Sequence, residues 1–266
     1  MKLNTSRFVT LSSIPFLVFA SFLSSSAQAA SISYPTQGPV PPGVTFTDIV
    51  ESSGTDPVPL FGSPTAFPVG LDFDPTSFVA SVTNGGADIT DGQLNFTIGG
   101  DVDLPNLVGI DVISLFEAGD YTLVGVGTPA TQVLAGAILR ATVTQIDGVN
   151  VAPIALSPVN ASVGFNLVAN PGVVQPWSLG LSLDVAAQLA NLGFDSGQSA
   201  TMVEVMIDNS LVALGELSSA SFIAKKEFFV TIGADPSNSA PEPTSFALLS
   251  FAAIGLLRFS RRRLSI

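Results

Sequence analysis

The chain has 266 residues, of which 47% are hydrophobic and 11% are charged, with no cysteine and no histidine. These two absences exclude disulfides, thiolate nucleophiles, imidazole metal ligands and a Ser-His-Asp triad. Residues 31–240 hold every acid except Glu242 but only three bases (Arg140, Lys225 and Lys226), which gives this part a net charge of −17. Because such a surface repels phosphate backbones, we expect no nucleic-acid partner.

Residues 1–29 have the pattern of a secretory signal peptide. Lys2 and Arg7 make a positive start, residues 8–22 are mostly apolar, and Ala27 and Ala29 flank Gln28 in an A-x-A cleavage site. We therefore expect export by the Sec machinery and a mature chain that begins at Ala30. The alternative is an uncleaved anchor, but the apolar stretch is short and ends in small residues.

The segment from Ser31 to Phe67 is rich in proline and glycine. Proline removes a backbone donor and fixes φ, which is unfavourable in long central strands. We expect an arm or loops here, with one edge strand over residues 43–50.

Strand patterns dominate from Val69 to Ile232. Leu94, Phe96 and Ile98 alternate with polar residues, which puts them on one face of a strand. Turn-forming clusters separate the apolar runs and predict hairpins. The expected turns lie at residues 84–86, 117–120, 147–148, 170–172 and 208–210.

One helix is expected over residues 184–192. Val185, Leu189 and Leu192 are spaced four and three apart, Asp184 stands at the start, and Gly193 provides a stop. Ten to twelve short strands with this helix predict an all-β fold, an antiparallel β-sandwich or jelly-roll-like single domain over residues 30–234. Residues 235–240 would form a short linker.

Residues 241–266 combine three features in a fixed order. Pro241-Glu242-Pro243 is followed by an apolar run over 244–257, and then by a basic cluster composed of Arg258, Arg261, Arg262 and Arg263. We expect a short transmembrane helix over 244–259 whose arginines stay in the cytoplasm. The apolar run would be roughly 21 Å long as a helix, against a bilayer core of roughly 30 Å. Such a marginal span suits a temporary anchor.

This tail resembles the PEP-CTERM sorting signal, on the strength of Pro241-Glu242-Pro243, the apolar run and Arg261-Arg262-Arg263. The resemblance implies a Gram-negative-type bacterium that makes exopolysaccharide. It also implies processing by a membrane protease of the exosortase class, followed by release or attachment at the cell surface. It covers residues 241 to about 263 and no part of the preceding domain. The alternative is an ordinary C-terminal anchor that follows a Pro-Glu-Pro sequence.

Calcium is the one metal that the sequence suggests. Asp72 and Asp74 form one D-x-D pair, and Asp101 and Asp103 form another. Residues i and i+2 of a strand share a face, so two carboxylates of a pair are placed to bind one Ca²⁺. The alternative is acids at loop ends in solvent, and no EF-hand spacing supports the metal.

Other motifs predict no chemistry. Asp195-Ser196-Gly197 matches an aspartic-protease tripeptide, but the chain has no second copy, so we expect a loop. Gly125-Val126-Gly127 is not followed by a helix that would cradle a phosphate. Arg140, in an apolar run, is expected to pair with an acid of a neighbouring strand or to face solvent.

Three function hypotheses follow. The first is a non-enzymatic surface or exopolysaccharide-matrix protein without a cofactor. The second is a carboxylate-based hydrolase such as a glycosidase, which needs only two carboxyl groups. The third is a calcium-dependent adhesion or binding module. The scarcity of Trp and Tyr counts against stacking on sugars, and the candidate carboxylates of the second hypothesis are Glu51, Glu117, Glu204, Glu216 and Glu227.

Overall fold

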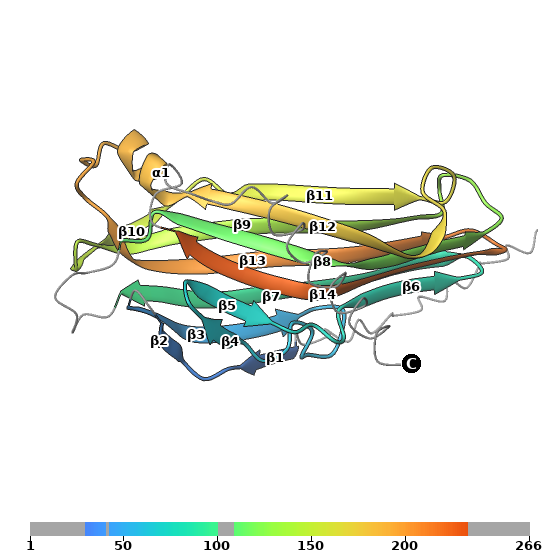
Figure 1. Ribbon diagram of the computed structural model, residues 1–266, viewed down its shortest axis with the longest axis horizontal. Coiled ribbons are helices and arrows are strands. Elements are labelled where there is room, and N and C mark those ends of the chain that lie inside the picture. Colours follow the sequence, from blue (N-terminus) through green and yellow to red (C-terminus); the bar gives the residue numbers. More distant parts are fainter. Residues whose placement is uncertain (1–29, 41–42, 101–108, 234–266) are drawn as a thin grey trace, which may run out of the picture.

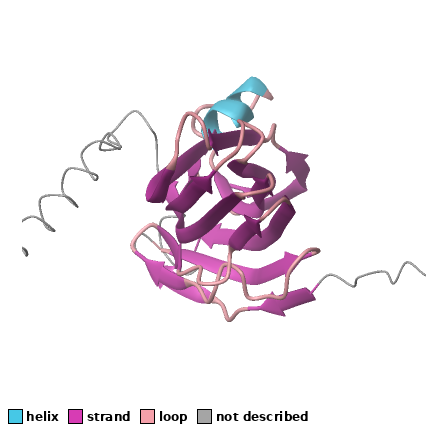
Figure 2. Cartoon of the chain, turned by 90° about the vertical axis from the view of Figure 1, so that its right-hand side faces the viewer, coloured by secondary structure: helices cyan, strands magenta, loops and turns pink. Residues whose placement is uncertain are grey.

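The computed structural model describes residues 30–40, 43–100 and 109–233. The predicted signal peptide with Ala27 and Ala29, the second acidic pair (Asp101 and Asp103) and the predicted sorting tail lie outside these residues. Strands dominate the described part, and it forms two antiparallel sheets packed face to face (Figures 1 and 2). The predicted all-β sandwich with one short helix is confirmed.

The larger sheet has eight strands in the order β1-β3-β7-β13-β9-β10, with β2 also paired to β3 and β11 also paired to β9. Every strand pair in it is antiparallel. Its strands are β1 (Ala30–Ser33), β2 (Gln37–Val40), β3 (Val44–Ser53), β7 (Gly86–Gly100), β9 (Gln132–Ile146), β10 (Val149–Ala155), β11 (Val159–Asn166) and β13 (Ala200–Gly215).

The smaller sheet has six strands in the order β12-β8-β14-β5-β4, with β6 also paired to β14. These pairs are antiparallel too. Its strands are β4 (Thr65–Phe67), β5 (Gly70–Phe73), β6 (Val79–Thr83), β8 (Val112–Gly125), β12 (Gly172–Asp184) and β14 (Ser219–Gly233).

The core lies between the sheets and follows from the two-residue period of the strands. Along β9 every second side chain is buried over the whole strand, and Leu94, Phe96 and Ile98 of β7 are at most 2% exposed. Phenylalanines fill much of the space between the sheets. The fully or almost fully buried ones include Phe46, Phe61, Phe73, Phe78 and Phe228.

Turn chemistry is confirmed at two hairpins. Asp147 and Gly148, between β9 and β10, have φ angles of 48° and 76°, which is the pattern of a type I′ turn. Asn84 and Gly85, between β6 and β7, also have positive φ.

The predicted helix is present as α1 (Val185–Asn191), at one end of the sandwich (Figure 1). The side chain of Asp184 accepts a hydrogen bond from the Ala187 amide, which caps the N-terminus. Val185 and Leu189 are buried as expected, whereas Leu192 is 58% exposed because it lies beyond the last helical turn. With seven residues, α1 is too short to cross a bilayer, and the described part of the chain contains no other helix.

Three predictions about the strands are wrong. Residues 117–120 and 208–210 are not turns, because β8 and β13 run straight through them and are paired on both sides. Residues 43–50 do not form an edge strand, because β1 and β2 cover the outer side of β3. In each case pairing with two neighbouring strands overrides a local preference for turn or edge.

A polar groove as the candidate functional site

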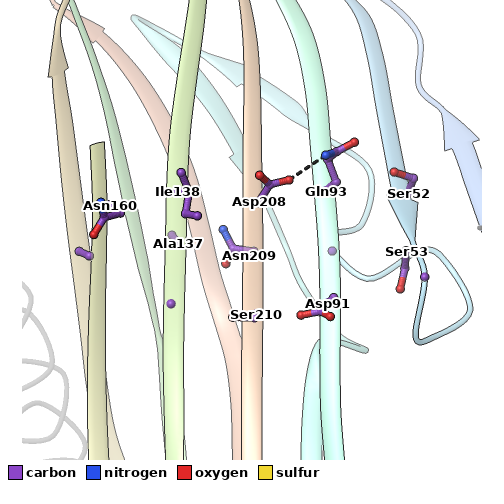
Figure 3. A pocket seen from close by; sticks show the side chains of 14 residues that line it. Ser52, Ser53, Asp91, Gln93, Ala137, Ile138, Asn160, Asp208, Asn209 and Ser210 are labelled. Atoms are coloured by element: carbon purple, nitrogen blue, oxygen red, sulfur yellow. Dashed lines mark hydrogen bonds between the residues drawn. The ribbon is translucent and has the colours of Figure 1, made fainter. Parts of the chain in front are cut away.

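A row of mostly polar side chains crosses the outer face of the larger sheet. The strand registers align Ser52 of β3, Gln93 of β7, Asp208 of β13, Ile138 of β9 and Asn160 of β11. All five side chains point away from the core. In the four strands β3, β7, β13 and β9, the residues directly before and after the aligned one are buried, so the side chain between them faces outward. Figure 3 shows them side by side over five strands.

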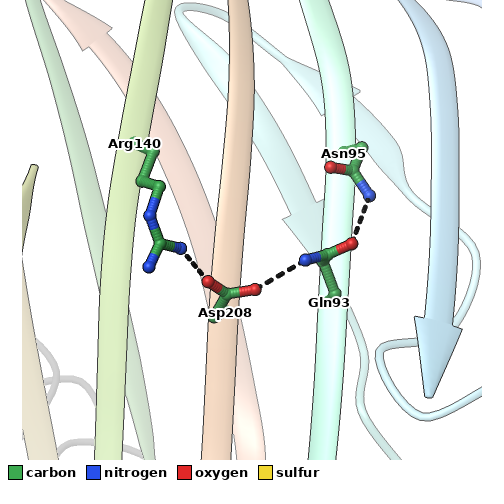
Figure 4. A network of polar contacts seen from close by, with 4 residues as sticks. All are labelled: Gln93, Asn95, Arg140 and Asp208. Atoms are coloured by element: carbon green, nitrogen blue, oxygen red, sulfur yellow. Dashed lines mark hydrogen bonds and ion pairs between the residues drawn. The ribbon is translucent and has the colours of Figure 1, made fainter. Parts of the chain in front are cut away.

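A hydrogen-bonded network fixes the centre of this row (Figure 4). Arg140 forms an ion pair with Oδ2 of Asp208, and Gln93 donates a 2.7 Å hydrogen bond to its Oδ1. Asn95 in turn donates to Oε1 of Gln93 over 3.3 Å. The expectation that Arg140 pairs with an acid of a neighbouring strand is confirmed. The network orders four polar side chains at a partly exposed surface.

Two hollows flank the network, and we call them together the polar groove. The first has a volume of about 600 Å³ and includes Gln93 and Asp208 in its wall. The second, of about 290 Å³, includes Asn95 and Arg140. The remaining polar residues of the walls that are not buried are Ser52, Asp91, Asn160 and Ser210 in the first hollow, and Asp48, Thr97, Thr142 and Glu204 in the second.

The groove carries more negative than positive charge. Asp91 and Asp208 line the first hollow, Asp48 and Glu204 line the second, and Arg140 is the one base among the lining residues. Burial, and to a lesser extent the nearby charge of Asp56, raises the pKa of Asp91 above its usual value. Such a groove disfavours anions and suits neutral, hydrogen-bonding ligands.

The acidic pair Asp72 and Asp74 lies elsewhere. Asp72 is on β5 of the smaller sheet, Asp74 follows that strand, and both are exposed with Phe73 buried between them. They share a face, as the spacing predicts. Within residues 30–40, 43–100 and 109–233, no group of three acids is placed to hold a metal ion. Calcium binding therefore stays a prediction.

Most of the candidate catalytic glutamates have other partners. Glu51 is fully buried and accepts hydrogen bonds from Tyr34 and from the backbone of residues 60 and 61. Glu216 accepts hydrogen bonds from the backbone amide of Thr128 and the hydroxyl of Thr131, both in a loop. Glu117 forms an ion pair with Lys225 inside the core. Of the five, Glu204 is the one that lines the polar groove.

The sequence did not predict the buried pair of Glu117 and Lys225. Both side chains are completely buried, although charged residues are almost never found in that state unless paired. Burial raises the pKa of Glu117 and lowers the pKa of Lys225, and the attraction between the two groups opposes both shifts. The available signal was a charged residue inside each of two segments that form strands, Glu117 in β8 and Lys225 in β14.

Comparison with protein-family models gives no match, and comparison with curated protein sequences gives none. Among solved structures, the chain has a TM-score of 0.20 and 10% identity with a loop-swap mutant of Xyn11A from Necallimastix patriciarum, over 77% of this chain and 100% of that one. For the structure of the infectious bursal disease virus Gx strain the TM-score is 0.16 and the identity 13%, over 82% of this chain and 60% of that one. Both scores are too low to bear on fold or function.

Proposed function

We propose that this protein is a non-enzymatic surface or exopolysaccharide-matrix protein of a bacterium, and that its polar groove binds a neutral polysaccharide. The observation that carries the proposal is the row of mostly polar side chains across five strands, with Asp208 held between Arg140 and Gln93. A ladder of this kind offers donors and acceptors at the strand spacing of about 4.8 Å. An extended polyhydroxylated chain presents the complementary groups at a comparable repeat.

The chemistry of the groove favours neutral over acidic polysaccharides. Four carboxylates against one guanidinium repel uronate, sulfate and phosphate groups. Carboxylates and carboxamides also accept hydrogen bonds from sugar hydroxyls, and charge-assisted bonds are the stronger ones. Trp177, Tyr34 and Tyr121 do not line either hollow. Without aromatic stacking the affinity of one site is modest, which suits a matrix where many copies bind one polymer.

The proposed route to the matrix rests on the two ends of the sequence. The signal peptide would direct export, and the tail from Pro241 would hold the chain in the inner membrane with its β-sandwich outside the cytoplasm. An exosortase-class protease would then cut at the tail. Mass spectrometry of protein recovered from the producing cells tests this route. A mature species that retains residues 246–266 contradicts it.

Affinity electrophoresis tests the groove. The full-length protein is run in gels that contain a neutral polysaccharide (dextran) or an acidic one (alginate). We expect dextran to retard the wild type, alginate not to, and Asp208→Ala to abolish the retardation. Asp72→Ala, which removes an exposed strand aspartate of the other sheet, is the matched control and should behave as wild type. Equal mobility of wild type and Asp208→Ala in dextran contradicts the proposal.

A hydrolase is the second candidate, and one observation favours it. Asp91 lies opposite Ser210, and Asp208 lies opposite Gln93, so the two aspartates are diagonal neighbours on the outer face of β7 and β13. Diagonal positions are about 7–8 Å apart, and a glycosidase needs two carboxyl groups across the scissile bond, one with a raised pKa. Release of reducing ends from dextran by the wild type but not by Asp91→Asn would support this candidate.

A further inference from the structure

The buried ion pair lies in an aromatic enclosure. Nζ of Lys225 is 4.3 Å from the ring centroid of Phe78, 5.0 Å from that of Phe228 and 5.4 Å from that of Phe61. The carboxylate of Glu117, on the neighbouring strand β8, is its ion-pair partner. Apart from this pairing, neither Nζ nor either oxygen of Glu117 has a hydrogen-bond partner among the described residues. The lysine and the glutamate thus share a dry site.

Asn209 is another buried polar residue whose side chain has no hydrogen-bond partner among the described residues. It lies between Ile207 and Leu211 on the inward face of β13 and is 4% exposed. Neither Nδ2 nor Oδ1 has a hydrogen-bond partner in the described part of the chain. Buried carboxamides are normally satisfied, so one that is not needs an explanation.

The strand register brings Asn209 to the same aromatic rings as Lys225. Asn209 is directly opposite Gly92 of β7, and directly opposed residues have Cβ positions about 5 Å apart. A Cβ on Gly92 would lie 2.8 Å from Cε2 of both Phe61 and Phe78. These two rings also pack around Nζ of Lys225.

We infer that Lys225 and Asn209 become joined by an intramolecular isopeptide bond, with Glu117 as the catalytic acid and base. Glu117 first accepts a proton from the Lys225 ammonium, which leaves a neutral amine. Nζ then attacks Cγ of Asn209, while the protonated Glu117 stabilises the negative charge that develops on Oδ1. The bond from Cγ to Nδ2 breaks, the proton lost by Nζ passes through Glu117 to the leaving nitrogen, and ammonia departs. One amide replaces another, so no oxidant or cofactor is required.

The electrostatics of the site favour the first step. Burial raises the pKa of Glu117 and lowers the pKa of Lys225, so both shifts stabilise the neutral acid and the neutral amine. A neutral amine is the nucleophilic form of lysine, and desolvation in an apolar pocket is a known way to obtain it. The aromatic enclosure also excludes water that would compete for Cγ.

The bond would tie the two sheets together. Asn209 belongs to the larger sheet and Lys225 to the smaller one, and they are 16 positions apart in a chain that has no cysteine. A covalent link of this kind would stabilise the fold in the way a disulfide does, because it restricts the conformations of the unfolded chain. Unlike a disulfide, it is not broken by reductants. It would suit a protein that must last outside the cell.

Peptide mapping of the denatured full-length protein tests the inference. An endoproteinase that cuts after glutamate separates Asn209, in peptide 205–216, from Lys225, in peptide 217–227. We expect one species with the summed mass of the two peptides less one ammonia, and its fragmentation should place the link at Asn209 and Lys225. Recovery of the two peptides separately and unmodified from the wild type overturns the inference without recourse to any variant.

Variants separate the isopeptide bond from other losses of ammonia. Asn209→Ala, Lys225→Met and Glu117→Gln should each give two separate peptides, whereas Lys226→Met, which changes the neighbouring exposed lysine, should retain the linked species. Asn209 is followed by Ser210, so cyclisation to a succinimide also releases ammonia. That product would be confined to peptide 205–216 and would persist in Lys225→Met, and this outcome contradicts the inference.

Discussion

The hydroxyl of Tyr34 donates a 2.6 Å hydrogen bond to Oε2 of Glu51, a carboxylate that is fully buried. The other oxygen, Oε1, accepts hydrogen bonds from the backbone amides of Leu60 and Phe61. Tyr34 directly follows β1, and Glu51 belongs to β3. One carboxylate of β3 therefore links the residue that follows β1 and the segment before β4.

Tyr34→Phe removes this hydroxyl and little else. We expect the free energy of unfolding to fall by about 1 kcal/mol, the typical net value of one hydrogen bond, because Tyr34 is only partly buried. Burial and the bond to Glu51 also raise the pKa of Tyr34. A raised pKa means that the unfolded chain loses its proton first, so this stabilisation is present below about pH 10 and declines above it. Urea denaturation of wild type and variant between pH 8 and 11 measures both effects, and a constant difference across this range contradicts the assignment.

In an Asn209→Ala background, which keeps the ion pair but cannot form the isopeptide bond, Lys225→Met leaves the carboxyl group of Glu117 buried without its cation. Breaking a buried pair by removing one partner costs about 3–5 kcal/mol, so we expect a loss of this size at pH 8. The pKa of Glu117, already raised by burial, rises further without the lysine. The variant should therefore regain stability as the pH falls and Glu117 becomes protonated.

In the same background, the double variant Glu117→Gln/Lys225→Met is the control for this explanation. It has no buried charge, so its stability at pH 8 should exceed that of Lys225→Met and should not increase at low pH through this site. Thermal melting at several pH values makes the comparison. Equal melting temperatures of the single and double variants at pH 8 would show that the buried charge is not the cause.

Much of the sandwich was predictable because its signals are local. The alternation along β7 and the Asp147-Gly148 turn each depend on residues that are neighbours in sequence. The helix is similar, since Asp184 and Gly193 flank it directly. Strand order was not predictable, because β13 pairs with β7 and β9 over long separations in the chain.

The two wrongly predicted turns coincide with the buried polar groups. Glu117-Ala118-Gly119-Asp120 and Asp208-Asn209-Ser210 contain residues that favour turns, yet they lie in the middle of β8 and β13. When turn-favouring residues occur in the middle of a strand, their presence is explained by packing or function and not by local conformational preference. Here Glu117 and Asn209 face the core, while Asp208 faces the polar groove. Sequence spacing cannot reveal this, because it depends on which strands lie opposite.

Glu216 anchors the loop before β9, and its replacement should loosen that loop. Its Oε2 accepts a 2.6 Å hydrogen bond from the Thr128 amide, and the hydroxyls of Thr128 and Thr131 add further bonds. The Thr128 amide is the largest cause of a lowered pKa at Glu216, followed in the same direction by the hydroxyl groups. A lowered pKa means that the stabilisation is present above the ordinary value of about 4.3 and is lost as the pH falls below it.

For Glu216→Gln we expect hydrogen exchange of the Thr128 amide to become several-fold faster at neutral pH, since a charge-assisted bond is replaced by a weaker one. In the wild type, the NMR shift of that amide should titrate with a midpoint below about 4.3. Glu227→Gln, at an exposed position of β14, should change neither quantity. A wild-type midpoint at or above the ordinary value contradicts the assignment.

Arg140→Met separates binding from stability in the polar groove. Because the side chains of Arg140 and Asp208 are 42% and 34% exposed, their ion pair contributes little to folding, and we expect the free energy of unfolding to change by less than about 1 kcal/mol. Asp208 then loses one of its two partners and is no longer held in one orientation, so retardation in dextran gels should weaken several-fold. Arg140→Lys keeps the charge but not the planar donor geometry of the guanidinium. Its retardation in dextran gels should therefore lie between that of the wild type and that of Arg140→Met. Unchanged retardation in Arg140→Met would show that the network does not order the binding site, and a loss of stability above about 3 kcal/mol would show instead that it holds the larger sheet together.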